Sequence, residues 1–271
     1  MLKIKLLLAI TFSLSLLQAH AQDLTIGAVA MDAPIEMIKR MTPLTDYIAR
    51  QTGYKVQFRP APSLDAAIED LGKDTVQITY MTPVAYINAH EKYQALPLVT
   101  PLTHGKATFN LVVAVRKDSP VKKLEDLKGK RFAFGDPKAL LQSAVLLDAG
   151  MKKEDFSEIA YLKHYDNIAK AIVMGDFDSG ILKDTVFEKF AAQGLRVVYT
   201  SPPLASYVFV VNSKVDSKTQ AKLTAAFMSL NNKNAEAISI LQALDQGYDG
   251  FQTASDKDYD GERKLISRLK K

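Results

Sequence analysis

The chain has 271 residues, of which 47% are hydrophobic and 24% charged, so its composition excludes a disordered chain and allows one large domain or two modest lobes. It has no cysteine, which excludes disulfides and a lipid-modified cysteine. The 35 basic and 30 acidic residues give a net charge of +5 without a long basic block, so the charge does not favour nucleic acid as a partner.

The first residues have the pattern of an export signal. Lys3 and Lys5 precede an apolar run at residues 6–17, and the small-x-small sequence Ala19-His20-Ala21 follows. We predict a signal peptide over residues 1–21, removed on export, and a periplasmic location. The run is too short for a permanent membrane helix, and no later stretch has the roughly eighteen apolar residues that a span requires, so we expect a soluble mature chain.

Short β-branched runs alternate with helical patterns along the mature chain. This alternation predicts an α/β fold with parallel, doubly wound sheets. Helices are expected to begin where a capping residue precedes a proline. The predicted strands are 24–29, 54–58, 76–80, 111–115, 131–134, 196–199 and 207–211, and the predicted helix starts are Thr42-Pro43, Thr82-Pro83 and Asp136-Pro137.

The C-terminal sixty residues have a different pattern. Residues 217–230, 234–244 and 260–269 are predicted to be helical, whereas 246–255 have a loop-like composition. Two α/β halves imply two lobes joined by a hinge. We place lobe 1 at residues 22–105 with 206–271 and lobe 2 at residues 106–205.

Ligands of open parallel sheets bind beyond the carboxyl ends of the strands, which places three turns at the cleft between the lobes. These turns supply the candidate ligand contacts Met31, Tyr80, Thr82, Lys138 and Ala139. Free N–H groups at a helix start favour an anion. The alternative is that Thr82 and Asp136 only cap their helices, which we favour for Asp136 because its carboxylate would compete with an anionic ligand.

Four further residues are candidate contacts. Tyr86 and Tyr165 can offer hydroxyls or ring faces, although tyrosines at such spacing are more often core residues. His164 lies in a loop that precedes a helix, where a surface or capping role is the alternative. Asp184 is the fourth, and its place at the cleft is implied by the family resemblance described below.

The sequence gives no support for catalysis. The histidines have no metal-ligand spacing, and neither a G-x-S-x-G nucleophile turn nor a catalytic cysteine occurs. No phosphate-binding loop or dinucleotide fingerprint is present. We therefore expect no enzyme activity, no metal site and no cofactor.

Four motifs resemble those of the phosphate, phosphite and phosphonate periplasmic binding proteins of ABC importers. They are residues 42–54, Met81-Thr82-Pro83-Val84-Ala85-Tyr86, residues 113–118 followed by 124–134, and residues 175–187, in the order and spacing of that family. The resemblance covers nearly all of the mature chain and implies the two-lobed type II periplasmic binding fold. It also implies a ligand between the lobes, contacted by aromatic and hydroxyl groups of the first lobe and by the helix start after the Asp-Pro turn.

This helix start departs from the family pattern Asp-Pro-x-Ser-Thr-Ser-Gly. Residues 136–142 read Asp-Pro-Lys-Ala-Leu-Leu-Gln, so every hydroxyl of the motif is missing. Because charge-assisted hydrogen bonds hold a buried oxyanion, we expect a weaker phosphonate site unless other donors replace them. Backbone N–H groups with Lys138 are one replacement, and Leu140 and Leu141 lining a site for a more apolar ligand are the alternative.

Capture of a small, anionic solute for an ABC permease is the function that we predict. The alternative is a periplasmic receptor that signals to a membrane sensor kinase. A periplasmic enzyme on the same scaffold is a third hypothesis. We expect the protein to act as a monomer that closes its lobes on the ligand.

Overall fold

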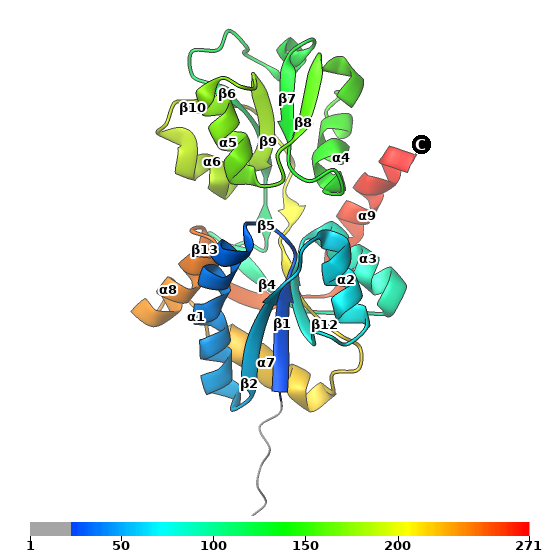
Figure 1. Cartoon of the computed structure of the whole chain (residues 1–271), viewed down its shortest axis with the longest axis vertical. Helices are drawn as coiled ribbons and strands as arrows, with labels where there is room; N and C mark the ends of the chain where they lie inside the picture. Colours follow the sequence, from blue (N-terminus) through cyan, green and yellow to red (C-terminus); the bar gives the residue numbers. More distant parts are fainter. Residues whose placement is uncertain (1–22, 271) are drawn as a thin grey trace, which may run out of the picture.

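The computed structural model describes residues 23–270 as two lobes, one above the other in Figure 1. The predicted signal peptide lies outside the described residues. Both lobes are sheets flanked by helices, which confirms the predicted two-lobed α/β fold. The boundaries placed at residues 105 and 205 remain a prediction.

Lobe 1 contains a six-stranded sheet of order β13-β4-β12-β3-β1-β2. Its strands are β1 (Asp23–Ala28), β2 (Lys55–Pro60), β3 (Ile78–Met81), β4 (Leu96–Thr103), β12 (Val208–Val211) and β13 (Tyr248–Thr253). Its helices are α1 (Pro34–Thr52), α2 (Leu64–Gly72), α3 (Pro83–Tyr93), α7 (Ser217–Met228) and α8 (Ala235–Leu244).

Lobe 2 contains a five-stranded sheet of order β10-β6-β9-β7-β8. Its strands are β6 (Leu111–Arg116), β7 (Arg131–Phe134), β8 (Glu158–Tyr161), β9 (Ser179–Lys183) and β10 (Leu195–Thr200). Its helices are α4 (Leu140–Asp148), α5 (Tyr165–Met174) and α6 (Asp184–Ala191), with 3₁₀ turns η1 (Leu124–Leu127) and η2 (Lys153–Asp155).

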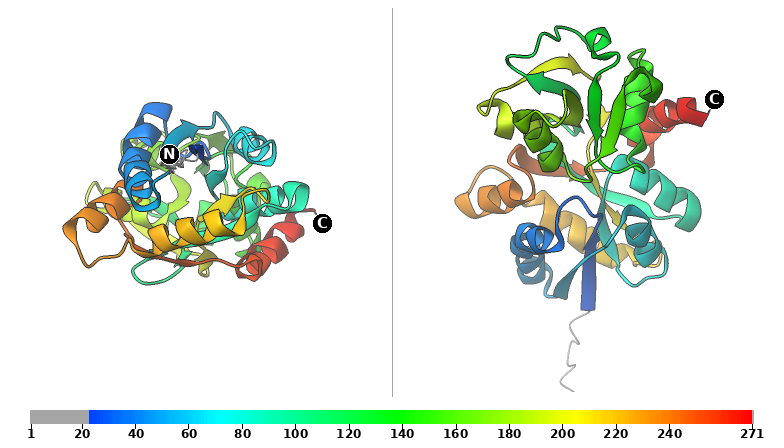
Figure 2. Two further views of the ribbon diagram at one scale, coloured as in Figure 1. Left: turned by 90° about the horizontal axis from the view of Figure 1, so that it is seen from below. Right: turned by 45° about the horizontal axis from the view of Figure 1, so that its top comes forward.

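Two short antiparallel strands, β5 (Thr108–Phe109) and β11 (Leu204–Ala205), connect the lobes. The C-terminal helix α9 (Asp260–Ser267) follows the turn η3 (Asp256–Tyr259) and is continued by η4 (Arg268–Lys270). This helix contacts both α3 of lobe 1 and α4 of lobe 2, and Figure 2 shows it along the side of the molecule where the two lobes meet. The lobes are therefore joined at the hinge and along α9.

The prediction of parallel strands is correct for only part of each sheet. Only the pairs β1–β2, β1–β3, β7–β8 and β7–β9 are parallel. The other pairs within the two sheets are antiparallel. In lobe 1, β12 re-enters the sheet between β3 and β4 after the chain has built lobe 2. In lobe 2, β6 pairs with β9 and β10.

Of the three predicted helix starts, Thr82-Pro83 is confirmed, with the Thr82 hydroxyl accepting a hydrogen bond from the Ala85 N–H at 3.2 Å. Thr42-Pro43 is wrong, because α1 already begins at Pro34 and continues through Pro43. Asp136-Pro137 is wrong as a helix start, since the carboxylate of Asp136 closes a turn on the Lys138 N–H at 2.8 Å and α4 begins later.

In the C-terminal segment the predicted helices are confirmed, but residues 246–255 are not a loop. Tyr248–Thr253 form β13, which pairs with β4. Neither strand has a strong strand signal, because β4 contains Pro97 and Pro101 and β13 contains Gly250. This pair matters for the site because Tyr248 points from it into the cleft region.

Candidate functional site

A small cavity of about 60 Å³ lies where the two lobes meet. Lobe 1 contributes Tyr80, Tyr207 and Tyr248 to its lining, and lobe 2 contributes Tyr165 and Lys183. We call this cavity, as lined by these five residues, the tyrosine cavity. Its volume is far below the roughly 300 Å³ at which common ligand pockets begin, so it suits a small ligand.

The tyrosine hydroxyls are close to one another. The hydroxyl oxygens of Tyr80 and Tyr248 are 2.5 Å apart, and Tyr165 interacts with Tyr207 and with Gln142. Burial raises the pKa of Tyr80, Tyr207, Tyr248 and Tyr165 above the ordinary value. These phenols therefore stay neutral and keep their O–H groups as hydrogen-bond donors.

Lys183 brings a buried positive charge to the cavity from the end of β9. Its side chain is only 5% exposed, and its Nζ lies 2.6 Å from Oδ2 of Asp245, which follows α8. Burial raises the pKa of the Asp245 carboxyl, but the Lys183 ammonium and hydrogen bonds from Gly247 and Thr185 outweigh this effect and lower the pKa below its usual value. The ion pair thus joins lobe 2 to lobe 1 at the cavity.

Two other carboxylates near the cavity also have cationic partners. Asp32 lies 3.7 Å from Arg40, and Asp166 pairs with Lys189. Since all three nearby carboxylates are paired, they oppose an incoming anion much less than free carboxylates would.

A second cavity of about 60 Å³ adjoins the turn before α4. Thr82 and Ala139 line it together with Met31, Tyr165 and Tyr207. The helix begins without a side-chain cap at Ala139, and the side-chain oxygen of Gln142 accepts the Gly135 N–H at 2.8 Å. Local contacts thus occupy part of the hydrogen-bonding capacity of this turn.

Six of the nine predicted contacts line these cavities: Met31, Tyr80, Thr82, Ala139, His164 and Tyr165. His164 also crosses the cleft, with its Nδ1 2.9 Å from the carbonyl oxygen of Met31. Three predicted contacts lie elsewhere in the structure.

Tyr86 is fully buried in the core behind α3, where its hydroxyl donates to Asp256 at 2.5 Å and its ring packs on Tyr259. Helical periodicity turns it away from the cleft, as the core alternative requires. Lys138 is exposed and pairs with Asp65 of lobe 1. Asp184 accepts the Asn110 N–H at 2.7 Å and so holds the start of α6 to the hinge segment.

Sequence reasoning missed Lys183, Tyr207, Asp245, Tyr248 and Gln142. Tyr207 and Tyr248 flank strands of lobe 1 that come from the C-terminal third of the chain, so their proximity to lobe 2 depends on the return of the chain through the hinge. The one available signal was Lys183, a charged residue that ends an otherwise uncharged segment at residues 179–182.

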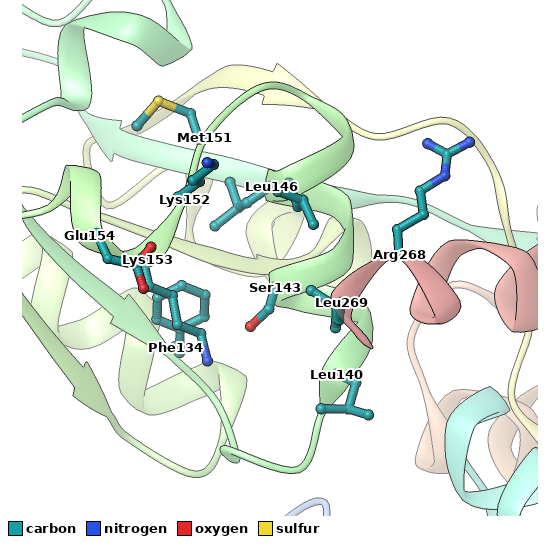
Figure 3. Close-up of a pocket in the computed structure, with 11 residues that line it drawn as sticks. Phe134, Leu140, Ser143, Leu146, Met151, Lys152, Lys153, Glu154, Arg268 and Leu269 are labelled. Atoms are coloured by element: carbon teal, nitrogen blue, oxygen red, sulfur yellow. The ribbon is translucent and has the colours of Figure 1, made fainter. Parts of the chain in front are cut away.

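A larger hollow than either of these cavities lies outside the cleft. It is a groove of about 530 Å³ between α4, η2 and the C-terminal turn, with apolar walls from Phe134, Leu146 and Leu269. Figure 3 shows Lys152, Lys153 and Glu154 on one side of it and Arg268 on the other. No convergent set of buried polar groups forms there, and we assign the binding site to the cleft.

Within residues 23–270 no group of three or more histidine or acidic side chains is placed to bind a metal ion. Across the same residues, no helix combines the length and the apolar character needed to span a membrane.

The family described as "ABC transporter, phosphonate, periplasmic substrate-binding protein" matches residues 26–259. The chain belongs to this family. A phosphate-import protein of Mycolicibacterium smegmatis is 26% identical over 91% of this chain and 85% of its own length. A phosphonates-binding periplasmic protein of Escherichia coli is also 26% identical, over 90% of this chain and 78% of its own length.

A phosphonate-binding family member from Prochlorococcus marinus, solved in complex with methylphosphonate, has the same fold. It superposes with a TM-score of 0.82 at 18% identity, over 92% of this chain and 98% of its own. These matches confirm the type II periplasmic binding fold and the predicted family. Family members are solute-binding components of ABC transporters, which confirms the predicted class of function.

Proposed function

We propose that this protein captures a small oxyanion of the phosphonate or phosphate class in the tyrosine cavity and delivers it to an ABC permease. The single observation that carries the proposal is the convergence of four tyrosine hydroxyls and the Lys183 ammonium from both lobes on one small cavity. The relatives named for phosphate import and for binding of phosphonates support the same chemical class.

The tyrosine hydroxyls take over from the hydroxyls that the turn before α4 lacks. A phenol is a donor to an anionic oxygen, and hydrogen bonds to a charged group are each worth roughly 1.5 to 3 kcal/mol. The Lys183 ammonium has three N–H donors, of which one is donated to Asp245 and one to the Tyr248 hydroxyl oxygen, and it adds a positive charge at the same wall. An oxyanion can thus be bound without a serine-rich helix start.

We also propose a location and an oligomeric state for the protein and expect no enzymatic activity. The protein is secreted with removal of residues 1–21, works in the periplasm as a monomer, and has no enzymatic step. Closure of the lobes over the ligand presents the permease with a surface that the open form lacks.

Calorimetric titration of the chain from Gln22 onward with methylphosphonate, phosphate, phosphite and methylsulfonate tests the ligand class. We expect binding of at least one of the phosphorus oxyanions, and Tyr165→Phe should weaken it about 10- to 100-fold because one charge-assisted hydrogen bond is lost.

Tyr86→Phe is the matched control, since it removes a buried hydroxyl outside the cleft. The affinity of the Tyr86→Phe variant for the oxyanion should equal that of the unmodified protein. Binding of none of these oxyanions would exclude the proposed class, and equal losses in both variants would exclude the tyrosine cavity as the site.

A further inference from the structure

The surroundings of the Lys183 ammonium form a cage. Its Nζ lies 4.7 Å from the ring centroid of Tyr248, 5.4 Å from that of Tyr207 and 5.8 Å from that of Phe109. The carboxylate of Asp245 closes the cage at 2.6 Å, and the Tyr248 hydroxyl lies at 3.5 Å. Rings within about 6 Å of a cation attract it through their negative faces, and this attraction grows when water is excluded.

Three aromatic rings and a carboxylate are the groups that recognise an alkylammonium ion. In this protein the ion that they surround is part of the chain itself. The cage is assembled from separate segments, because Phe109 belongs to the hinge strand β5 while Asp245 and Tyr248 come from the C-terminal part of lobe 1. Lys183 reaches it from lobe 2, next to Leu111 at the start of β6.

We infer that Lys183 permanently fills an ammonium-binding subsite of the cleft, and that the natural ligand is therefore a small anion that carries no ammonium group. The statement about the ligand rests on the proposed function, whereas the statement about the subsite does not. A ligand with an amino group would have to displace Lys183 and leave its charge buried without a partner, which is costly.

Chemical complementation tests the subsite. Lys183→Ala removes the atoms from Cγ to Nζ, which correspond to n-propylammonium. We expect n-propylammonium chloride to raise the melting temperature of Lys183→Ala in a saturable manner, whereas sodium chloride at equal ionic strength and n-propanol should not. The unmodified protein and Lys189→Ala, which removes an exposed lysine, should show no saturable response. An equal response to n-propanol, or none to n-propylammonium, overturns the inference.

If Lys183→Ala does not fold, nuclear magnetic resonance of the unmodified protein decides the same point. The Hε resonance of Lys183, assigned by through-bond correlation to its own backbone amide, should be shifted upfield of all other lysine Hε resonances by the surrounding rings. A signal at the position of an exposed lysine shows that the cage is empty and overturns the inference.

The ligand class is tested by comparing ethylphosphonate with 2-aminoethylphosphonate on the unmodified protein. We expect at least about tenfold tighter binding of ethylphosphonate, which corresponds to about 1.4 kcal/mol. Equal or tighter binding of 2-aminoethylphosphonate contradicts the inference that the ligand carries no ammonium group. Binding of phosphate or phosphite but of neither compound agrees with the stated class, because those anions carry no ammonium group. Binding of no phosphorus oxyanion at all contradicts the proposed function alone, because complementation of Lys183→Ala still tests the subsite.

Discussion

The buried pair of Lys183 and Asp245 links the stability of the protein to pH. The pKa of Asp245 in the folded protein lies below that of an aspartate in the unfolded chain, about 3.9. A group with a lowered folded pKa contributes stability that is present above the unfolded pKa and is lost as pH falls through the folded pKa. The contribution of this pair is therefore full above about pH 5 and declines below pH 4.

Asp245→Asn leaves the Lys183 ammonium buried without a counter-charge, and we expect it to lower the free energy of unfolding by about 3 to 5 kcal/mol at pH 7. The difference from the unmodified protein should shrink as pH falls from about 5 toward 3. Urea unfolding followed at a series of pH values measures both effects.

Asp118→Asn is the control, since it breaks an exposed pair with Arg116 and should leave stability nearly unchanged. A loss in Asp245→Asn that stays constant down to pH 3 would show that the charge of Asp245 does not stabilise the fold.

At the scale of single elements, α9 is attached to the hinge through Glu262. Its carboxylate is buried and accepts the N–H of Ala205 in β11 at 2.7 Å. Burial raises the pKa of Glu262, so at neutral pH the folded protein bears the cost of an ionised carboxylate that the unfolded chain keeps in water.

Glu262→Gln keeps an acceptor for the Ala205 N–H and removes this cost. We expect the variant to be more stable than the unmodified protein at pH 7, with the difference vanishing by about pH 4, where the carboxyl of the unfolded chain also becomes protonated. Glu262→Ala loses the acceptor and should be destabilised by about 1 to 3 kcal/mol. Thermal unfolding at pH 4 and pH 7 compares the stability of the variants. A gain in the stability of Glu262→Gln that does not depend on pH contradicts the raised pKa of the Glu262 carboxyl.

Helices and strands differ in how well the sequence predicts them. Strong local signals, such as the β-branched residues of β6 and the cap at Thr82, lead to correct elements. The start of α1 was misplaced because Pro34 and Pro43 each suit the first turn of a helix, and only packing favours the earlier one. Strands β4 and β13 depend on pairing with each other across more than a hundred residues, which a local pattern does not contain.

At the scale of the whole molecule, the contacts that cross the cleft include those of Lys183 with Asp245, of His164 with Met31, and of Lys138 with Asp65. The first lies beside the hinge, since Lys183 pairs with Leu111 directly after β5. The sequence predicts the lobes and six of the cavity residues. It does not predict the lysine cage, because that arrangement exists only once the lobes have met.

Because the chain has no cysteine, two introduced cysteines can be spin-labelled without background. Labels at Asp65→Cys and Lys138→Cys report on the opening of the cleft, and the loss of this exposed ion pair should cost little. We expect methylphosphonate to shorten and narrow the distance distribution measured by pulsed electron paramagnetic resonance. Labels at Lys117→Cys and Lys152→Cys, both in lobe 2, should show no change, and an identical distribution with and without bound ligand would exclude closure.

The position of β12 between β3 and β4 has a consequence for the order in which the protein is assembled. All five strands of the lobe 2 sheet come from residues 111–200, so that sheet can be completed while the C-terminal quarter of the chain is still being synthesised or exported. The lobe 1 sheet cannot, because until residue 211 emerges β3 and β4 have no strand to join them. The first lobe to be synthesised is therefore the last to mature, and its unpaired strands need protection from aggregation during that interval.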